Sequence, residues 1–231
     1  MDSLDELLQS DSVSGATGRT DDTEEIEQTP AEVVAELQKA WLNECLAPDL
    51  LPHRCEIVEC LLEVLANVEK GSRRAPKGDH RAVFHRMEVD RIRYMITSYM
   101  RCRLQKLEKY CFHVAQEDAG RSIDNFESKL SEEEQRFLSE SVFFQSGSHD
   151  FDDISLFIFL KAFVKETSRT VLPNRNSYVF LSVNKSCRGV AIPDPTDEAR
   201  EDIINLEAGT QHIVPYKPIS ALLERGDVTL I

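Results

Sequence analysis

A long arginine-rich segment in the middle of an acidic chain constrains this sequence most. Residues 79–114 contain neither Pro nor Gly, so they predict one uninterrupted helix, the third of the chain. Residues 70–109 hold 12 Lys or Arg against 4 Asp or Glu, although the whole chain carries a formal net charge of −14. A basic helix in an acidic protein binds nucleic acid, binds an acidic partner, or is neutralised inside the fold.

The side chains of this segment do not sort into two faces of a helix. At about 100° per residue, with Arg91 at 0°, Arg103 lies at about 120°, Arg93 at about 200° and Arg101 at about 280°. The apolar residues are spread as widely around the axis: Tyr94, Met95, Ile96, Tyr99, Met100 and Leu104. We therefore expect a helix buried on several sides. Its arginines would pair with carboxylates, because an isolated buried charge is very costly.

The overall composition excludes several classes of protein. A length of 231 residues allows one or two domains. The net charge of −14 argues against coating DNA by bulk electrostatics, because phosphates repel an acidic surface. No apolar run approaches the ~18 residues that span a membrane, and the acidic N-terminus does not resemble a secretory signal. Six Cys without a CxxC motif predict free thiols in the cytosol or nucleus.

Residues 1–28 are expected to be a disordered acidic tail. They hold nine acidic residues and the single Arg19, a composition too polar to form a core. Leu4, Leu7 and Leu8 are spaced i, i+3, i+4 beside Asp5 and Glu6. This short stretch is either part of a solvated tail or a linear motif that folds on a partner.

Residues 29–168 predict an all-helical domain of about five helices. Thr29 and Glu32 form the pattern of a capping box, as do Ser131 and Glu134. Residues 116–130 read as a polar connector. Apolar periodicity and stop signals place the helices at about 30–47, 55–70, 79–114, 131–146 and 150–165.

The sequence pattern changes from helical to strand-like after a linker at residues 169–176. Residues 177–183 are nearly all apolar, as in a buried strand. Further short strands and one short helix follow, and Glu207-Ala208-Gly209-Thr210 reads as a hairpin-type turn. Residues 177–231 therefore predict a small β-rich domain. The fold class is α+β, with a helical A domain around a long central helix followed by this B domain.

No pattern of catalytic residues stands out. The phosphate-binding, dinucleotide-binding, serine-hydrolase and zinc-protease motifs are absent from the sequence. His53, Cys55 and Cys60 are spaced irregularly and lack a fourth ligand, so packing thiols explain them better than zinc. We expect no enzyme activity, no cofactor and no metal.

The basic loop before the long helix supports an alternative function. Arg73, Arg74 and Lys77, with Arg81 and Arg86 at the start of the helix, could contact phosphate groups. The same residues also suit a solvated loop facing acidic neighbours. A nucleic-acid-binding protein that uses residues 73–86 is therefore the second hypothesis.

Several motifs in a fixed order resemble one known family. The long helix, from Arg91-Ile92-Arg93-Tyr94 to Lys106-Leu107-Glu108-Lys109, resembles the central helix of GINS complex subunits of the Sld-five type. Similar patterns occur before and after it: Thr29-Pro30-Ala31-Glu32, Ala40-Trp41, Ala47-Pro48, Ser177-Tyr178-Val179-Phe180-Leu181, Asn205-Leu206-Glu207 and Gly226-x-Val228-x-Leu230-Ile231.

The resemblance implies a nuclear scaffold protein of DNA replication without its own enzymatic activity. Its expected partners are three sister GINS subunits, the Cdc-forty-five protein and the MCM ring of the replicative helicase. A Ctf-four or AND-one type adaptor and a replicative polymerase are further expected partners, and contact with nucleic acid would be indirect or weak. Leu4, Asp5, Glu6, Leu7 and Leu8 loosely resemble the adaptor-binding motif. The candidate subunit-interface residues are Arg91, Arg93, Tyr94, Tyr99, Arg101, Arg103, Lys106 and Glu108.

Overall fold

The computed structural model describes residues 29–72, 80–123, 128–146, 171–193 and 201–231. This part of the chain divides into two compact units. The first lies within Met1–Trp41 and Arg54–Ser98, and the second within Leu42–His53 and Tyr99–Ile231. The expected tail at 1–28, the basic loop residues 73–77 and the fifth helix at 150–165 fall outside the described residues.

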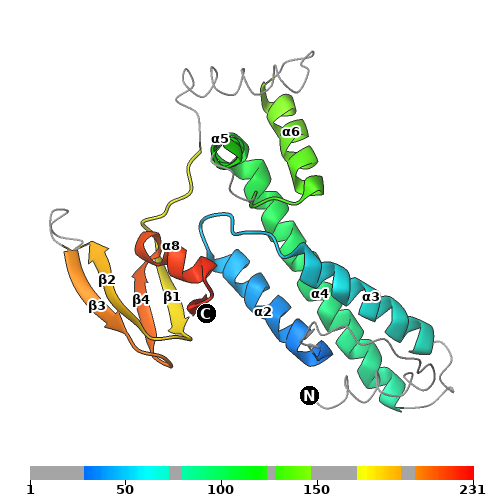
Figure 1. The fold of residues 1–231 in the computed structure, drawn as a ribbon. Coiled ribbons are helices and arrows are strands. Elements are labelled where there is room, and N and C mark those ends of the chain that lie inside the picture. Colours follow the sequence, from blue (N-terminus) through cyan, green and yellow to red (C-terminus); the bar gives the residue numbers. More distant parts are fainter. Residues whose placement is uncertain (1–28, 73–79, 124–127, 147–170, 194–200) are drawn as a thin grey trace, which may run out of the picture. The chain divides into compact units, whose positions relative to one another are not determined.

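The α+β class predicted from the sequence is confirmed. In the part of the chain that the structure describes, five helices come first, followed by a small region of antiparallel strands with one further helix (Figure 1). The helices are α2 (Pro30–Leu46), α3 (Cys55–Ser72), α4 (His80–Lys109), α5 (Cys111–Ile123) and α6 (Glu132–Ser146). The later elements are β1 (Tyr178–Val183), β2 (Cys187–Pro193), β3 (Glu201–Leu206), β4 (Gln211–Pro215), α8 (Tyr216–Glu224) and β5 (Val228–Leu230).

Both predicted capping boxes form. The Thr29 amide donates to Glu32 Oε2 at 2.9 Å, and the Glu32 amide donates back to Thr29 Oγ1 at 3.4 Å. At α6, the Ser131 amide donates to Glu134 Oε2 at 3.1 Å, and the Glu134 amide donates to Ser131 Oγ at 3.2 Å. Each box satisfies amides that the first helical turn leaves without partners, so both helix starts are fixed locally.

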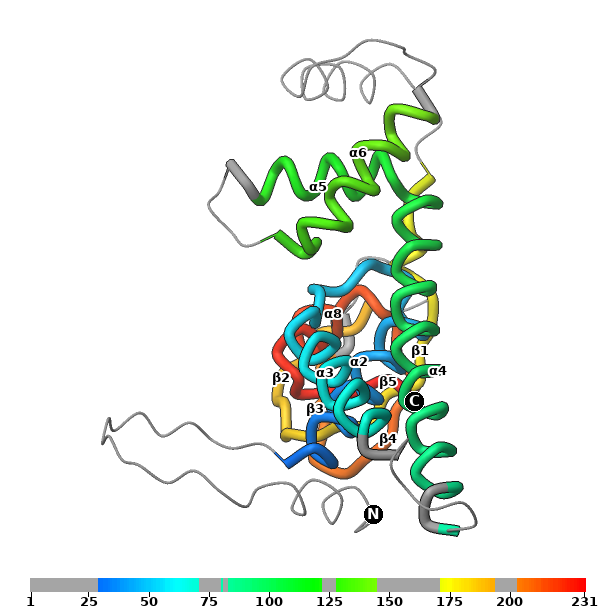
Figure 2. Tube along the Cα trace, turned by 90° about the vertical axis from the view of Figure 1, so that its right-hand side faces the viewer, coloured from blue at the N-terminus to red at the C-terminus, as the bar shows by residue number. Residues whose placement is uncertain are grey.

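The long helix is shorter than predicted. α4 ends at Lys109, and α5 runs on to Ile123 through most of the expected polar connector. Figure 2 shows α5 turning sharply away from the line of α4. The turn brings α5 beside α6, where Leu107, Cys111, Val114, Leu138 and Val142 share a buried core. Tertiary packing therefore ends α4 at a place where the local sequence carries no stop signal.

The prediction that α4 is buried on several sides is wrong for the chain by itself. One stripe is buried, and its members recur every three or four residues: Val89, Ile92, Met95, Ile96, Tyr99, Arg103 and Leu107. The opposite side is exposed and carries Val83, Met87, Tyr94, Arg101 and Leu104. α4 thus has one buried side and one exposed side. Arg103, on the buried side, and the large apolar residues on the exposed side obscured this in the sequence.

The strands form two separate sheets. β1 is the central strand of a three-stranded antiparallel sheet in the order β4-β1-β5, and among the described residues β2 pairs with β3 alone. α8 covers one face of the larger sheet through Tyr216, Ile219 and Leu223, which belong to the same buried core as the inward strand residues. The larger sheet therefore has one face packed on a helix.

The turn at Glu207–Thr210 is not a hairpin between paired neighbours. It carries the chain from β3 in the small sheet to β4 in the large one. Gly209 adopts φ 83° there, a left-handed conformation that a residue with a Cβ adopts only with strain. Its amide donates to Val183 O at 2.8 Å, which ties the turn to the end of β1.

The β-rich region and the segment 42–53 belong to the same compact unit. Ala47 lies in the core formed by the strands and α8. The Leu230 amide donates to Asn43 Oδ1 at 2.8 Å, and Arg175 Nε lies 2.7 Å from Asp49 Oδ2. The B domain therefore packs against the end of α2 and the loop that follows it.

Candidate functional site

Arg103, the most buried of the arginines on α4, lies at the centre of a charged cluster. Its side chain is 1% exposed. Nε and one terminal nitrogen donate to the two oxygens of Glu134 at 2.6 and 2.8 Å. The other terminal nitrogen donates to Glu44 Oε2 at 3.0 Å. The carbonyls of Leu51 and Lys129 accept the remaining two bonds, at 2.7 and 3.1 Å. All five donors of the guanidinium are therefore used.

Lys106 completes the cluster one helical turn later. Its ammonium donates to Glu44 Oε1 at 2.7 Å, to the Glu44 carbonyl, and to the Asp49 carbonyl at 2.8 Å. The Glu44 carbonyl is among the last four of α2, which have no partner within the helix. A cation there is favourable because the negative end of the helix dipole lies at the C-terminus. Two cations and two carboxylates, Glu44 and Glu134, thus balance in charge.

Local structure positions each carboxylate. Glu134 is held by its capping box with Ser131, so one oxygen serves both the start of α6 and Arg103. Glu44 lies seven residues after the buried Leu37, on the same side of α2, and is fully buried. Arg103 and Lys106 were predicted as functional residues from the sequence, but neither carboxylate was. The signal was present, because Glu44 and Arg103 are charged residues on otherwise apolar stripes.

The cluster keeps Arg103 firmly protonated. Burial alone would lower the pKa of Arg103. The hydrogen bonds that Arg103 donates to Glu134 and the nearby negative charges outweigh burial, so the pKa is raised above its ordinary value. With every donor engaged and no solvent access, the guanidinium has nothing to offer a substrate or a nucleic acid. The cluster therefore has a structural role. It holds together α6 and those parts of α2 and α4 that belong to the second compact unit.

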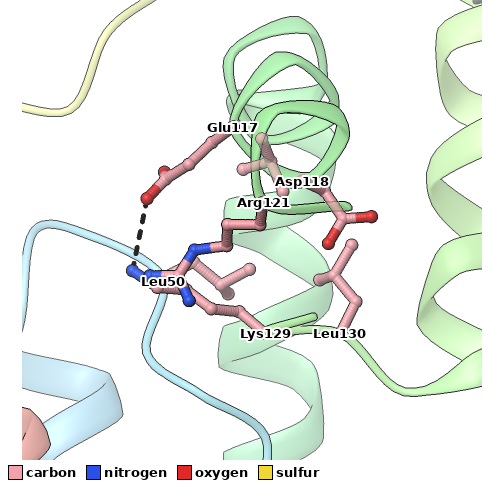
Figure 3. Close-up of a pocket in the computed structure, with 7 residues that line it drawn as sticks. Leu50, Glu117, Asp118, Arg121, Lys129 and Leu130 are labelled. Atoms are coloured by element: carbon pink, nitrogen blue, oxygen red, sulfur yellow. Dashed lines mark hydrogen bonds and ion pairs between the residues drawn. The ribbon is translucent and has the colours of Figure 1, made fainter. Parts of the chain in front are cut away.

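A shallow pocket opens beside α5 in the second unit. Figure 3 shows Glu117, Asp118 and Arg121 projecting from that helix toward Leu50, Lys129 and Leu130. Lys129 Nζ lies 3.3 Å from Glu117 Oε1 and 3.1 Å from Glu224 Oε1. Asp118 accepts a hydrogen bond from Ser128. Glu117, Asp118 and Lys129 are thus already engaged in ion pairs or hydrogen bonds, so the pocket does not resemble a built ligand site.

A potential metal-ligand group lies near this pocket. Asp49, His113 and Glu117 bring one ligand atom each within 4.8 Å of one another. Arg175 Nε lies 2.7 Å from Asp49, and Lys129 lies 3.3 Å from Glu117. A cation would have to displace these side chains from the carboxylates, so the group is best explained as an ion-pair network.

The candidate interface residues on α4 fall into two groups. Tyr99 and Arg103 are 2% and 1% exposed and lie in the chain's own interior, and Lys106 is engaged beside them. Burial therefore assigns these three to internal packing rather than to a contact surface. The others are exposed: Arg91, Arg93, Tyr94, Arg101 and Glu108. The adaptor-motif candidates at 4–8 and the phosphate candidates Arg73, Arg74 and Lys77 lie outside the described residues.

The exposed side of α4 carries several large apolar side chains. Val83, Met87 and Tyr94 are 57%, 62% and 65% exposed, and their spacing of four and seven residues places them on one side of the helix. We call this set the α4 face. Tyr94 is held edge-on against Trp41, with ring centroids 6.1 Å apart. Arg91 lies next to the face and pairs with Glu88 at 2.9 Å. Large apolar side chains beside an arginine are typical of a protein–protein contact.

These features define a class: a helical bundle joined to a small β-sheet domain, with a charged structural interior and an apolar helix face open to solvent. Comparison with known families supports a specific assignment. Residues 48–142 match the GINS complex protein helical bundle domain, and residues 173–231 match the DNA replication complex GINS protein SLD5 C-terminus.

Full-length relatives agree with both matches. The mouse DNA replication complex GINS protein SLD5 is 40% identical over 211 residues, which cover 90% of this chain and 93% of the relative. The Xenopus laevis protein is 37% identical over 237 residues and covers 98% and 99%. The Saccharomyces cerevisiae protein is 23% identical, covering 95% and 87%. The chain belongs to the SLD5 family of GINS proteins.

Proposed function

We propose that this chain is a non-catalytic scaffold subunit of a GINS complex in DNA replication. Its assignment to the SLD5 family supports a role in replication, and the cluster around Arg103 supports a structural rather than a chemical interior. No helix among the described residues is long and apolar enough to cross a membrane. A nuclear location follows from the replication role and belongs to the proposal.

The α4 face is the observation that carries this proposal. Val83, Met87 and Tyr94 expose large apolar side chains along one side of a helix whose other side is buried from Val89 to Leu107. Covering such a row removes apolar surface from water at roughly 25 cal/mol per Å². A helix of a sister subunit, laid along α4, would bury the row. Arg91 and Arg101 would then lie near carboxylates of that subunit.

The finer partner assignments belong to the same proposal. The assembled subunits would join the Cdc-forty-five protein to the MCM ring, and the acidic segment at residues 4–8 would dock on an adaptor. These contacts would use surfaces left exposed after the subunits assemble. They rest on the family assignment rather than on any geometry of the described residues.

Co-expression with the three sister subunits tests the proposal. The wild-type chain is expected to co-purify with them as one stoichiometric assembly. Tyr94→Ala and Arg91→Glu are expected to lower the yield of that assembly several-fold, since they remove an apolar contact and reverse a charge at the α4 face. Arg54→Glu, an exposed charge reversal before α3, is the matched control and should leave the yield unchanged.

Two different results would contradict the scaffold role and the role of the α4 face. A stable monodisperse monomer that ignores the sister subunits would contradict the scaffold role. Normal assembly of both variants would leave the role intact and remove the α4 face from it. Thermal melts of the variants alone would show that a lost assembly does not come from unfolding.

A further inference from the structure

Two cysteine side chains meet between α2 and α4. Cys45 lies in the last turn of α2 and Cys102 lies on α4, and both belong to the second compact unit. Cys102 Sγ lies 3.8 Å from the carbonyl oxygen of Glu44, the residue before Cys45. The two thiols are also hydrogen-bonded to each other. Both cysteines are free, so the two helices bring a pair of reduced sulfurs into contact.

A lysine ammonium lies beside this pair. Lys106 Nζ and Cys102 Sγ donate to the same carbonyl oxygen, that of Glu44. Lys106 also follows Cys102 by one helical turn, so the two side chains project from the same side of α4. A positive charge next to a cysteine favours the thiolate, which is the form that reacts with oxidants. The surroundings of the pair therefore differ from those of a buried, inert thiol.

The two thiols differ in how firmly they hold their protons. Partial burial raises the pKa of Cys45, and the Cys102 sulfur raises it further, as a negative charge and as a hydrogen-bond partner, to about 11. Lys106 acts in the opposite direction without outweighing these causes. In such a coupled pair the protons leave one after the other. Cys45 keeps its proton while Cys102 loses its own, so Cys102 is the first nucleophile of the pair.

Small reagents can reach both sulfurs. Cys45 is exposed and Cys102 is half-buried, although their neighbours Glu44 and Arg103 are closed to water. A disulfide requires the two sulfurs to lie about 2.05 Å apart. Starting from hydrogen-bond contact, the two side chains reach that distance by rotation and a small approach. The fold around the pair therefore need not open for a bond to form.

We propose that Cys45 and Cys102 form a reversible disulfide when a peroxide oxidises the chain, and that this bond locks the end of α2 to α4. The device is built into the chain itself. It does not depend on the scaffold role, and it adds a response to oxidants that the scaffold role does not include.

The reaction balances with hydrogen peroxide as the oxidant. The Cys102 thiolate attacks one peroxide oxygen, the O–O bond breaks, and the leaving hydroxide takes up a proton to give water and a sulfenic acid on Cys102. The Cys45 sulfur then attacks that sulfur, the S–O bond breaks, and the Cys45 proton leaves with the hydroxyl as a second water. Two thiols lose two electrons and one peroxide gains them. A thiol reductant reverses the bond by thiol–disulfide exchange.

The bond would stabilise the fold next to the charged cluster. Cys45 follows Glu44 and Cys102 precedes Arg103 in the sequence, so the disulfide joins the backbones that carry this buried ion pair. It also closes the chain from 45 to 102, with α3 inside, into a covalent loop. A disulfide that closes a long loop restricts the unfolded chain strongly. The oxidised chain should therefore resist unfolding better than the reduced one.

Peroxide treatment of the purified full chain tests the bond. The native chain is treated with a small excess of hydrogen peroxide, its remaining thiols are blocked with N-ethylmaleimide, and its peptides are analysed by mass spectrometry without reduction. Peptides linked through Cys45 and Cys102 are expected to exceed every other cysteine pair roughly ten-fold, because only neighbouring sulfurs reach disulfide geometry. Dithiothreitol should remove the link. Absence of this link, or links spread over all the cysteines, would overturn the proposal.

Single substitutions test the order of the two steps. Cys45→Ser removes the second sulfur, so the sulfenic acid on Cys102 should persist and react with dimedone. Cys102→Ser should leave Cys45 largely unlabelled, because that thiol keeps its proton. Cys60→Ser is the matched control, since Cys60 is an exposed thiol on α3 outside the pair, and it should form the link as the wild type does. Equal dimedone labelling of the first two variants would overturn the role of Cys102.

Thermal melts test whether the bond locks the fold. Oxidation is expected to raise the melting temperature of the wild type and of Cys60→Ser by roughly 5 °C or more, and dithiothreitol should reverse the rise. Cys45→Ser and Cys102→Ser should melt at the same temperature before and after peroxide treatment. A cross-linked wild-type chain with an unchanged melting temperature would overturn the locking role.

Discussion

Arg103 and Arg93 lie on the same helix but differ completely in their surroundings. Arg103 is buried, and all five of its donors have acceptors on three other segments of the chain. Arg93 is half exposed and pairs with Glu69 of α3 while remaining in contact with water. Both are paired arginines. Burial, rather than pairing as such, decides how much each contributes to stability.

The largest expected effect comes from removing Arg103. Arg103→Met leaves Glu134 buried without a cation, and breaking such a pair costs about 3–5 kcal/mol. Urea unfolding followed by circular dichroism would measure this loss. The double variant Arg103→Met with Glu134→Gln should be more stable than the single one. Gln keeps the capping box and removes the buried charge. A double variant that is less stable than the single one would contradict the charge argument.

The next effect comes from the capping box that holds Glu134. Ser131→Ala removes the hydroxyl that accepts from the Glu134 amide and should cost about 1 kcal/mol, the usual value for a lost N-cap. The same urea titration would detect it. Ser131→Thr, which keeps the hydroxyl, is the control. A loss as large as that of Arg103→Met would mean that the cap, and not the arginine, anchors the start of α6.

Arg93 tests how little an exposed ion pair contributes to stability. Arg93→Gln should change stability by no more than about 1 kcal/mol, because exposed pairs gain little and are screened by salt. Raising the salt concentration should shrink even that difference, whereas the Arg103 effect should persist. A loss for Arg93→Gln that equals the loss for Arg103→Met would refute the distinction between the two arginines.

The smallest expected effect is on the reactivity of Cys45, the residue that follows Glu44 of the buried cluster. Cys45 is exposed as a residue, but partial burial of its thiol and the neighbouring Cys102 raise its pKa to about 11. A raised pKa keeps the thiol protonated, so Cys45 should react with iodoacetamide more slowly than a free cysteine at pH 8. Its rate should increase through a midpoint near pH 11. Mass spectrometry of the alkylated peptides would follow this, and a midpoint near 9.0, the ordinary thiol value, would contradict it.

Local features of the fold were readable from the sequence. The two capping boxes depend on residues three apart, and both form as predicted. The strands of the B domain followed from their apolar content and the turn residues between them, which also depend on near neighbours. The interface candidates Arg91, Tyr94 and Arg101 are exposed, and their contacts stay a prediction.

Contacts between residues far apart in the sequence could not be predicted. Glu44 and Arg103 pair across 59 positions, and nothing local indicates which carboxylate an arginine will find. The end of α4 at Lys109 is set by packing of α5 on α6 rather than by a breaker residue. The turn at Glu207–Thr210 has hairpin composition, yet it joins strands of different sheets, because strand partners are chosen by the whole domain.

The bond between the Leu230 amide and Asn43 Oδ1 joins residues 187 positions apart. At roughly 5–20 residues per second, a ribosome makes Leu230 about 10–40 s after Asn43. β1 also stays unpaired until β4 and β5 have been synthesised, since both of these neighbouring strands follow it in the sequence. During that interval the end of α2 and both edges of β1 lack their final partners. A nascent chain of this protein therefore offers a defined window in which chaperones can bind it.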